Sequence, residues 1–307
     1  MRNKEDITNW FKDLQDNICQ SLETLDGLAS FKEDHWERPN AGGGGRSRVI
    51  TNGSLIEKGG VNFSAVHGDL PEKIQNALGF GPSTFYATGV SIVLHPVNPW
   101  VPIIHMNVRY FETESLKDHQ STYWFGGGID LTPHYVNATS GHYIHQRLKE
   151  ACDKTDPSYY SRFKKWADNY FYIKHREETR GVGGIFYDHL NEEKESHSFE
   201  DLWEFHQNVG KAFIPIYAHY ANTNRDKPYS KEHLDWQRLR RGRYVEFNLV
   251  WDRGTKFGLD TNGRTESILM SMPPQADWVY DHQPAAGTPE AESLKWLKKD
   301  INWLADA

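Results

Sequence analysis

Hydrophobic and polar positions divide the chain into helical segments near its ends and strand-like segments in its middle. Apolar residues recur every three or four positions across residues 8–26, which predicts an amphipathic helix. Residues 85–135 instead contain short apolar and aromatic runs bounded by turn residues, a pattern typical of antiparallel hairpins. With no linker dividing the chain, these patterns predict a single α+β domain over residues 1–307, built around a mainly antiparallel sheet.

The same pattern predicts further elements after residue 135. Asp156 and Pro157 are suited to the cap and first position of a helix over 157–179, which Gly181 would end. The other predictions are a strand at 184–190, a helix at 199–221 bent near Pro215, strands at 241–252 and 266–273, and a last helix capped by Thr288.

Composition and charge narrow the class of protein. The net charge is −7, whereas proteins that bind nucleic acids are more often basic, so we expect no nucleic-acid partner. The two cysteines, Cys19 and Cys152, form no CxxC motif, which argues against a disulfide framework or a zinc-thiolate site. The charged N-terminus and the lack of a long apolar run predict no membrane span and a cytoplasmic protein.

The segment 103–111 carries polar groups suited to chemistry. If it is a strand, His105, Asn107 and Arg109 share one face, because alternate residues point to the same side. Pairing with the preceding strand would add Ser91 and His95 to this face. The opposite face would be apolar and would contain Ile104, Met106, Val108 and Tyr110. An ordinary solvated face is the alternative, although such faces more often hold Lys, Glu and Thr.

Two glycine-rich stretches admit two interpretations each. Residues 126–128 are three glycines that precede Asp130. They could form a flat floor for a broad ligand, with Asp130 accepting hydrogen bonds from ligand N–H groups, or they could mark a twisted strand with a bulge. The stretch 41–50 (AGGGGRSRVI) could be a flexible loop or a turn that holds an anion on backbone N–H groups.

Arginines and histidines suggest an anionic ligand and, more weakly, a metal. Arginine forks bind carboxylates well, and a cluster of them would suit a polycarboxylate, although a single arginine more often forms a surface ion pair. The candidate arginines are Arg109, Arg180, Arg240, Arg241, Arg243 and Arg264. His67 and Asp69 have the HxD spacing of a two-His-one-carboxylate iron site, a weak signal in a chain with 15 histidines. The motifs GxSxG, HExxH and GxGxxG are absent.

Several long motifs together resemble the oxygen-dependent coproporphyrinogen III oxidase family. They occur in order between residues 40 and 275: GGGGRSRVITNGSLIEKGGVNFS, VSIVLHPVNPWVPIIHMNVRYFE, WFGGGIDLTP, RGVGGIFYDHL, RGRYVEFNLVWDRGTKFGL and GRTESILMSMPP. The resemblance implies a large antiparallel sheet with helices on both faces, and a homodimer with an interface that includes about 240–275. It also implies oxidative decarboxylation of two propionates of coproporphyrinogen III, with O2 as co-substrate and no organic cofactor.

The resemblance also assigns roles to individual residues. His105 falls on the proton donor, Asp130 on the group that meets the pyrrole N–H groups, and Arg109 completes the expected catalytic set. The implied substrate-binding positions are Ser91, Asn107, Val108, Arg109, Arg180, Gly263 and Arg264. A divalent metal, such as manganese, is an open question, and the matching histidines are His95, His105, His145 and His175.

The chain departs from the family pattern in two places. It reads FYDHL at 186–190 where many relatives have FFDDL, and it has Trp251 where Tyr is common. Two other functions stay open at this point: a metal-dependent oxygenase built on His67, Asp69 and a distal histidine, and a tetrapyrrole carrier without catalytic activity.

Overall fold

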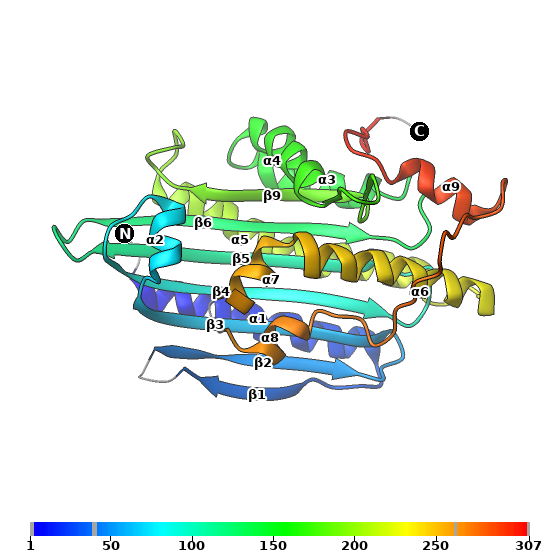
Figure 1. Cartoon of the computed structure of the whole chain (residues 1–307), viewed down its shortest axis with the longest axis horizontal. Coiled ribbons are helices and arrows are strands. Elements are labelled where there is room, and N and C mark those ends of the chain that lie inside the picture. Colours follow the sequence, from blue (N-terminus) through cyan, green and yellow to red (C-terminus); the bar gives the residue numbers. More distant parts are fainter. Residues whose placement is uncertain (1–2, 39–41, 261–262, 306–307) are drawn as a thin grey trace.

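A seven-stranded antiparallel sheet forms the centre of the protein in the computed structural model, which describes residues 3–38, 42–260 and 263–305 (Figure 1). The strand order is β1-β2-β3-β4-β5-β6-β9, so six strands follow each other both in the chain and in the sheet. The strands are β1 (Lys32–Glu37), β2 (Gly43–Thr51), β3 (Ile56–Asp69), β4 (Ser83–Pro96), β5 (Ile103–Ser115), β6 (Ser121–Thr132) and β9 (Gly183–Leu190), with β7 (Tyr172–Ile173) and β8 (Glu178–Thr179) as a separate hairpin.

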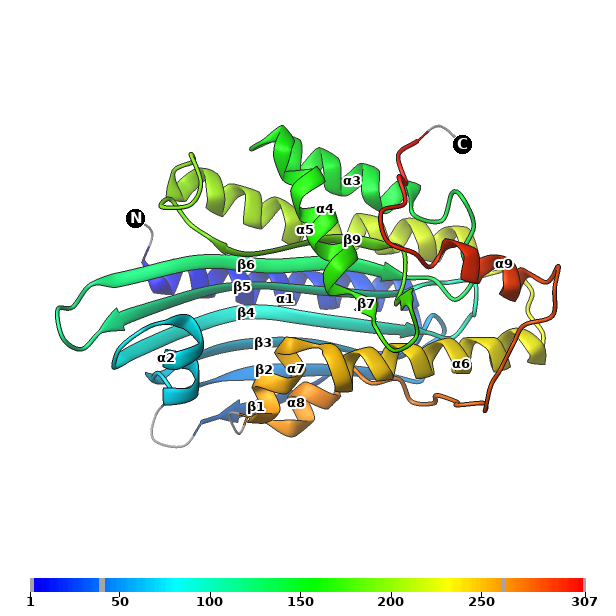
Figure 2. The ribbon, with the colours of Figure 1, turned by 45° about the horizontal axis from the view of Figure 1, so that its top comes forward.

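Helices cover both faces of the sheet (Figure 2). One face carries α1 and α5, whereas α6, α7 and α8 lie over the other face (Figures 1 and 2). The helices are α1 (Lys4–Asp26), α2 (Glu72–Leu78), α3 (His142–Asp153), α4 (Pro157–Tyr170), α5 (Phe199–Asn224), α6 (Lys231–Glu246), the π-helical turn η2 (Phe247–Trp251), α7 (Arg253–Asp260), α8 (Thr265–Leu269) and α9 (Pro289–Trp296). The predicted α+β class with helices on both faces is confirmed. In the described part of the chain, no helix combines the length and apolar character needed to cross a membrane.

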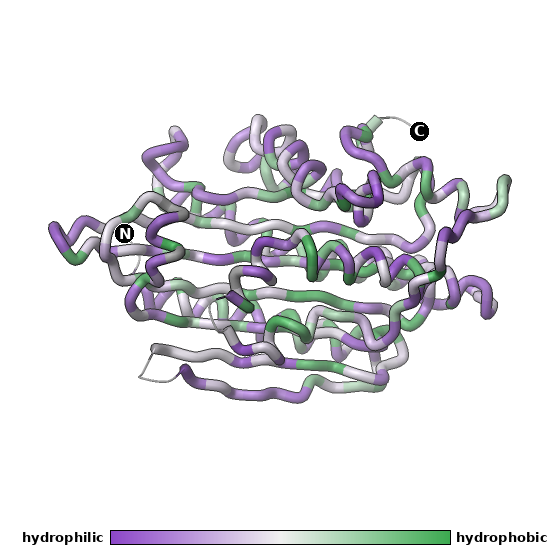
Figure 3. Tube along the Cα trace, viewed as in Figure 1, coloured by the Kyte–Doolittle hydropathy of each residue, from purple (hydrophilic) through white to green (hydrophobic). Residues whose placement is uncertain are grey.

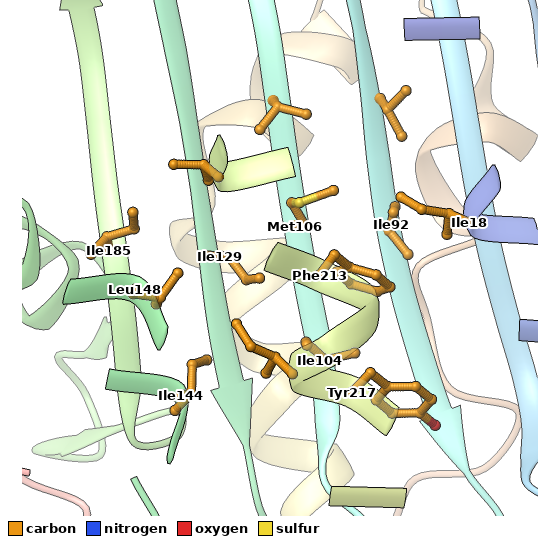
Figure 4. Packing of buried hydrophobic residues seen from close by; sticks show 14 of the residues in the cluster. Ile18, Ile92, Ile104, Met106, Ile129, Ile144, Leu148, Ile185, Phe213 and Tyr217 are labelled. Carbon is orange, nitrogen blue, oxygen red and sulfur yellow. The ribbon is translucent and has the colours of Figure 1, made fainter. Parts of the chain in front are cut away.

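The main core lies between the sheet and the helices α1, α3 and α5 (Figure 4). Ile104, Met106 and Val108 of β5 are fully buried there, against Phe213 of α5 and its neighbours. The alternation along 103–111 therefore predicted the two faces correctly. Because one face of β5 is committed to this core, the register of the strand is fixed, and its polar residues must all point to the opposite side.

The predicted helix at 157–179 is shorter than expected. Asp156 does cap it, accepting a hydrogen bond from the Ser158 N–H, but the helix ends at Tyr170. Residues 172–179 form the hairpin β7–β8 instead, with Glu177 in a left-handed conformation at φ 56°. This hairpin leads the chain back to the sheet, and it is followed directly by Arg180.

The predicted strand at 241–252 is wrong. This segment continues α6 and then forms η2. Two buried arginines explain why the strand prediction failed. Arg240 pairs with Glu178 at 2.8 Å, and Arg241 pairs with Glu57 at 2.7 Å. The helix therefore buries charged residues and shows no apolar stripe, as the hydrophilic colour along much of α6 indicates (Figure 3).

The predicted strand at 266–273 is also wrong, because Thr265–Leu269 is the short helix α8. Backbone carbonyls that follow it bind side chains of the sheet and not a neighbouring strand: Lys58 donates to Met272 and His95 contacts Ser271. In the glycine-rich stretch 41–50, the residues from Gly43 onward belong to strand β2, which runs between β1 and β3. Neither the predicted loop nor the predicted anion-binding turn is therefore present there, and Ala41 lies outside the described residues.

Candidate active site

Neighbouring strands bring the predicted polar residues together on the face beneath α6, α7 and α8. In the register of the sheet, Ser91 of β4 lies opposite Asn107 of β5, and His105 lies opposite Asp130 of β6. The expected pairing of β4 with β5 across the turn is confirmed. Because side chains in register project from the same face, His105, Asn107, Arg109 and Asp130 form one continuous polar surface.

His105, Asp130 and Arg180 form a hydrogen-bonded chain. The Nδ1 atom of His105 lies 2.8 Å from Oδ1 of Asp130. Arg180 donates to both oxygens of Asp130, from Nη2 at 2.7 Å and from Nε at 2.9 Å. The side chains of Asp130 and Arg180 are 1% and 2% exposed, whereas His105 is 20% exposed. Of these three hydrogen-bonded side chains, the His105 imidazole is therefore the one that can contact a ligand.

An aromatic cage and an amide hold Arg180 in place. The guanidinium lies 4.4 to 4.8 Å from the ring centres of Phe171, Tyr244 and Phe247. Its Nη1 donates to Oδ1 of Asn248, in the π-helical turn η2, at 3.0 Å. Cation–π contacts with desolvated rings stabilise a buried arginine. This cage could not be predicted from the sequence, because Tyr244, Phe247 and Asn248 lie in the segment that was predicted as a strand.

The charge of Arg180 controls the ionisation of Asp130. Burial alone would raise the pKa of Asp130, but the positive charge of Arg180 and the hydrogen bond to His105 outweigh it, so the pKa lies below its usual value. Asp130 is therefore a carboxylate that can only accept hydrogen bonds, so the Nδ1 of His105 must carry the proton in this contact. The Nε2 atom of His105 is then the nitrogen available for proton transfer.

This geometry bears on two roles that the resemblance assigns. Asp130 is 1% exposed and accepts three hydrogen bonds from His105 and Arg180, so in this structure it is not open to a ligand N–H group. Arg180 lies beneath Asp130 and not on the open surface, so in this structure it is not free to bind a propionate. Arg180 instead positions Asp130, and through it His105.

Arg109 is a partly exposed arginine of the site. Its Nη1 donates to Oδ1 of Asn107 at 2.9 Å, and its Nη2 pairs with Asp188 of β9 at 2.8 Å. The glycines at 126–128 make room for the protein's own side chains: a Cβ atom at Gly126 would lie 2.5 Å from Asp188, and one at Gly127 would lie 2.8 Å from the Tyr187 hydroxyl. The bulge expected near these glycines is present, since the register with β9 shifts between Phe125 and Gly127.

The remaining predicted substrate positions are spread more widely. Ser91 is half-buried on the polar face, beside Asn107. Val108 faces the core, so only its backbone could contact a substrate. Arg264 binds Asp34 of β1 and Ser267, so it lies at the β1 edge of the sheet, four strands away from Arg109 of β5. The Gly263 N–H donates to the carbonyl of Gly258.

The four histidines proposed as metal ligands do not converge. His95 is buried with Nε2 at 2.8 Å from the Ser271 carbonyl, and both ring nitrogens of His145 are engaged, by Tyr160 and by the Val182 carbonyl. His175 lies between Glu246 and Trp251, while His105 binds Asp130. Within residues 3–38, 42–260 and 263–305, no three His, Cys, Asp or Glu side chains form a group that could hold a metal.

His67 and Asp69, the alternative iron ligands, line a surface hollow of about 350 Å3 at the other end of the strands. Glu112 in this hollow already pairs with Lys4 at 2.8 Å and accepts a hydrogen bond from Tyr110. The metal-oxygenase hypothesis built on the HxD spacing therefore finds no third ligand among the described residues.

Comparisons with known proteins agree with the motifs. The family model described as coproporphyrinogen III oxidase matches residues 6–303. The chain is 48% identical over 300 residues to coproporphyrinogen-III oxidase 1, chloroplastic, of Arabidopsis thaliana, covering 94% of this chain and 76% of that protein. It is 48% identical over 303 residues to the oxygen-dependent coproporphyrinogen-III oxidase, chloroplastic, of Glycine max, covering 95% and 77%. This chain belongs to the coproporphyrinogen III oxidase family.

Proposed function

We propose that the protein is an oxygen-dependent oxidase that converts two propionate side chains of coproporphyrinogen III to vinyl groups, giving protoporphyrinogen IX. Family membership and the relatives named oxygen-dependent coproporphyrinogen-III oxidase support this function. The observation that carries it on this chain is the partly exposed His105, oriented by the buried Asp130–Arg180 pair and lying two residues along β5 from Asn107 and four from Arg109.

The reaction balances without an added cofactor. At each propionate, the carbon attached to the pyrrole ring loses a hydrogen with its electron pair, the terminal carboxylate leaves as CO2, and a carbon–carbon double bond forms. Molecular oxygen takes up this hydrogen together with its electron pair and, with one further proton from the protein or solvent, becomes hydrogen peroxide. A porphyrinogen is electron-rich and easily oxidised, so the task of the protein is orientation and placement of charge and protons.

His105 is suited to the proton transfer. With Nδ1–H donated to Asp130, Nε2 can take up or release a proton at the reacting side chain. The carboxylate fixes the tautomer and the ring orientation, and it stabilises the imidazolium when Nε2 is protonated. Arg180 keeps Asp130 ionised, and Asn248 and the aromatic cage keep Arg180 in register.

Arg109 and Arg264 would bind carboxylates of the substrate. Each is partly exposed, at 33% and 29%, and they lie on different sides of the polar face. Coproporphyrinogen III carries four carboxylates around a broad macrocycle, so widely separated arginines match it better than one cluster would. We propose no organic cofactor. No step is assigned to a metal either, because the histidines do not form a ligand set.

Turnover by metal-stripped protein tests the function directly. Purified protein would be incubated with coproporphyrinogen III with and without air, and the tetrapyrroles would be separated by chromatography and followed by fluorescence. We expect the two-vinyl product only with O2 and without added metal. Turnover that returns only with iron or manganese would favour a metal enzyme, and binding without turnover in any condition would show a carrier.

Arg109→Ala tests the assigned site in the same assay. Loss of a charge-assisted contact to a carboxylate should lower kcat/KM by about 10- to 100-fold, while the Tm changes little because Arg109 is partly exposed. Lys231→Ala, which removes an exposed ion pair on α6, is the matched control. A kcat/KM of Arg109→Ala equal to that of wild type would remove Arg109 from the site.

We further propose a homodimer and a cytoplasmic location. Leu249, Val250 and Leu259 are large apolar residues that are between 43% and 46% exposed, all within 240–275, and Tyr280 just beyond is 99% exposed. Exposed apolar groups that cluster in this way are typical of an interface. Light scattering of wild type and Val250→Asp tests the dimer.

Both cysteines are free and buried, as suits a reducing compartment, although the relatives are named chloroplastic. Imaging of a fluorescent fusion tests the location.

A further inference from the structure

The ion pair between Arg109 and Asp188 crosses over a strand. Arg109 belongs to β5 and Asp188 to β9, and β6 lies between them in the sheet. Their side chains nevertheless meet, with Nη2 of Arg109 at 2.8 Å from Oδ2 of Asp188. Two side chains from strands on either side of a third can meet in this way only if the middle strand leaves the space above it open.

Gly126 leaves that space open. It lies opposite Arg109 in the register of β5 and β6, and a Cβ atom there would lie 2.5 Å from Oδ1 of Asp188 and 2.7 Å from Nη2 of Arg109. Both distances are shorter than real Cβ contacts, and no other residue type could occupy the position without moving the pair. The first glycine of the triplet is therefore explained by this one contact.

A bulge in β9 aims Asp188 at Arg109. Phe125 pairs with Leu190 and Gly127 pairs with Tyr187, so two residues of β9, Asp188 and His189, lie opposite Gly126 alone. His189 adopts a left-handed conformation at φ 54°, and its N–H donates to Oδ1 of Asp188 at 3.0 Å. Bulges commonly re-aim a side chain near an active site, and a non-glycine residue at positive φ costs free energy. Together the bulge and the backbone bond fix one carboxylate oxygen and leave the other for Arg109.

We propose that Asp188 is an internal placeholder carboxylate, which holds Arg109 in the free enzyme and is displaced from it when a carboxylate of the substrate binds. This inference rests on the proposed function, since it takes a polycarboxylate as the ligand of Arg109. Asp188 is a positioning residue that acts through Arg109.

The geometry of the pair suits exchange. Asp188 contacts a single nitrogen of the guanidinium, Nη2, and Asn107 takes Nη1. A carboxylate that binds in the favoured two-pronged manner needs two neighbouring nitrogens, and both usable edges of the guanidinium include Nη2, so the ligand would approach the nitrogen beside which the Asp188 carboxylate already lies. The two side chains are 33% and 23% exposed, which makes the pair weak enough to be broken by a ligand.

The placeholder also suits a reaction that destroys carboxylates. Each turnover converts substrate carboxylates to CO2, so the product offers fewer anions than the substrate. Asp188 can return to Arg109 when the product leaves, and the arginine is then never left without an acid partner. The placeholder therefore weakens the binding of substrate and favours the release of product.

Asp188→Asn tests the proposal, because the amide keeps the size and the bond to the His189 N–H but removes the charge. The probes are coproporphyrin III, the non-reacting aromatic tetracarboxylate, for Kd, and coproporphyrinogen III for KM and kcat. We expect Kd and KM to fall by about two- to fivefold, the worth of a partly exposed ion pair. We expect kcat to stay the same or to fall, because product release slows.

Controls separate this role from a merely structural one. Asp188→Glu keeps the charge and should bind the probe as wild type does, and Glu195→Gln removes the acid of another arginine pair, with Arg162 on α4, and should change nothing. In the Arg109→Ala background, Asp188→Asn should have no effect on Kd. A higher or unchanged Kd in Asp188→Asn, or a lower Kd that persists without Arg109, would overturn the proposal. Failure of the proposed function would show differently, as absence of turnover in the wild-type protein.

Discussion

Removal of Arg180 is the sharpest test of the buried chain beneath His105. In Arg180→Met the side chain keeps much of its volume inside the cage of Phe171, Tyr244 and Phe247, but Asp130 loses both hydrogen bonds from the guanidinium. Asp130 is 1% exposed, so water cannot replace these bonds. Removing one partner of a fully buried ion pair costs about 3–5 kcal/mol, and we expect a loss in this range at pH 7.5.

The loss should depend on pH, and the direction follows from Asp130. In the wild type the pKa of Asp130 lies below its ordinary value, so the pair stabilises the fold above pH 4 and is lost only as the pH falls through the lowered pKa. Without Arg180, burial is the dominant influence and raises the pKa of Asp130 above the value in the unfolded chain. The deficit of the variant should therefore be largest at pH 7.5 and smaller at pH 5.5, where Asp130 more readily takes up a proton.

Urea denaturation at the two pH values measures the stability, and turnover of coproporphyrinogen III measures the chemistry. We expect kcat to fall by about 100-fold, since His105 loses the anion that orients it. Asp130→Asn combined with Arg180→Met leaves no buried charge and should recover part of the stability but none of the activity. A loss below about 1 kcal/mol in Arg180→Met, or a loss that is equal at both pH values, would refute this account of the site.

Three further predictions concern other buried groups. Gly126→Ala should push Arg109 itself out of position as well as separate it from Asp188, which should lower kcat/KM by about tenfold and cost about 1–3 kcal/mol of stability. Gly81→Ala, where an added Cβ meets nothing within 4 Å, should change neither kcat/KM nor stability. Burial lowers the pKa of His145 and His206 to about 3, so the folded chain cannot take up the protons that the unfolded chain binds below pH 6.5. Each histidine should therefore lower the free energy of unfolding by about 1.4 kcal/mol at pH 5.5, and a Tm that does not fall between pH 7.5 and 5.5 would contradict this. Gln15→Leu leaves the carbonyls of Arg46 and Val61 without their buried donor and should cost about 2–3 kcal/mol in urea denaturation, with activity retained.

The sequence revealed the parts of the fold in which local pattern and burial agree. In β5 every second residue is buried in the core, so the period-two pattern predicted the strand, its two faces and the meeting of His105 with its neighbours. Helix α6 buries arginines that find acids on distant segments, Glu57 and Glu178, and such pairing leaves no local pattern to read.

The site itself was only half visible from the sequence for the same reason. His105 and Arg109 lie on one strand, and their shared face follows from their spacing. The contact of Asp130 with Arg180 joins residues 50 positions apart, and Asn248 lies a further 68 positions from Arg180. The bulge at Asp188 depends on the register between β6 and β9, and neither strand shows by itself where the extra residue falls.

The strand order also decides when the site can be completed during folding. Strands β1 to β6 follow each other in the chain and pair in that order, so six of the seven strands can form the sheet from contacts between neighbours within residues 32–132. Asp130 is then in place, but its partner Arg180, and Asn248, which holds Arg180, come later in the chain. Until the second half of the chain docks, the carboxylate must stay hydrated, and it holds that face of the sheet open to water. Burial of Asp130 thus requires the second half of the chain, so the candidate site is complete only once that half has packed against the sheet.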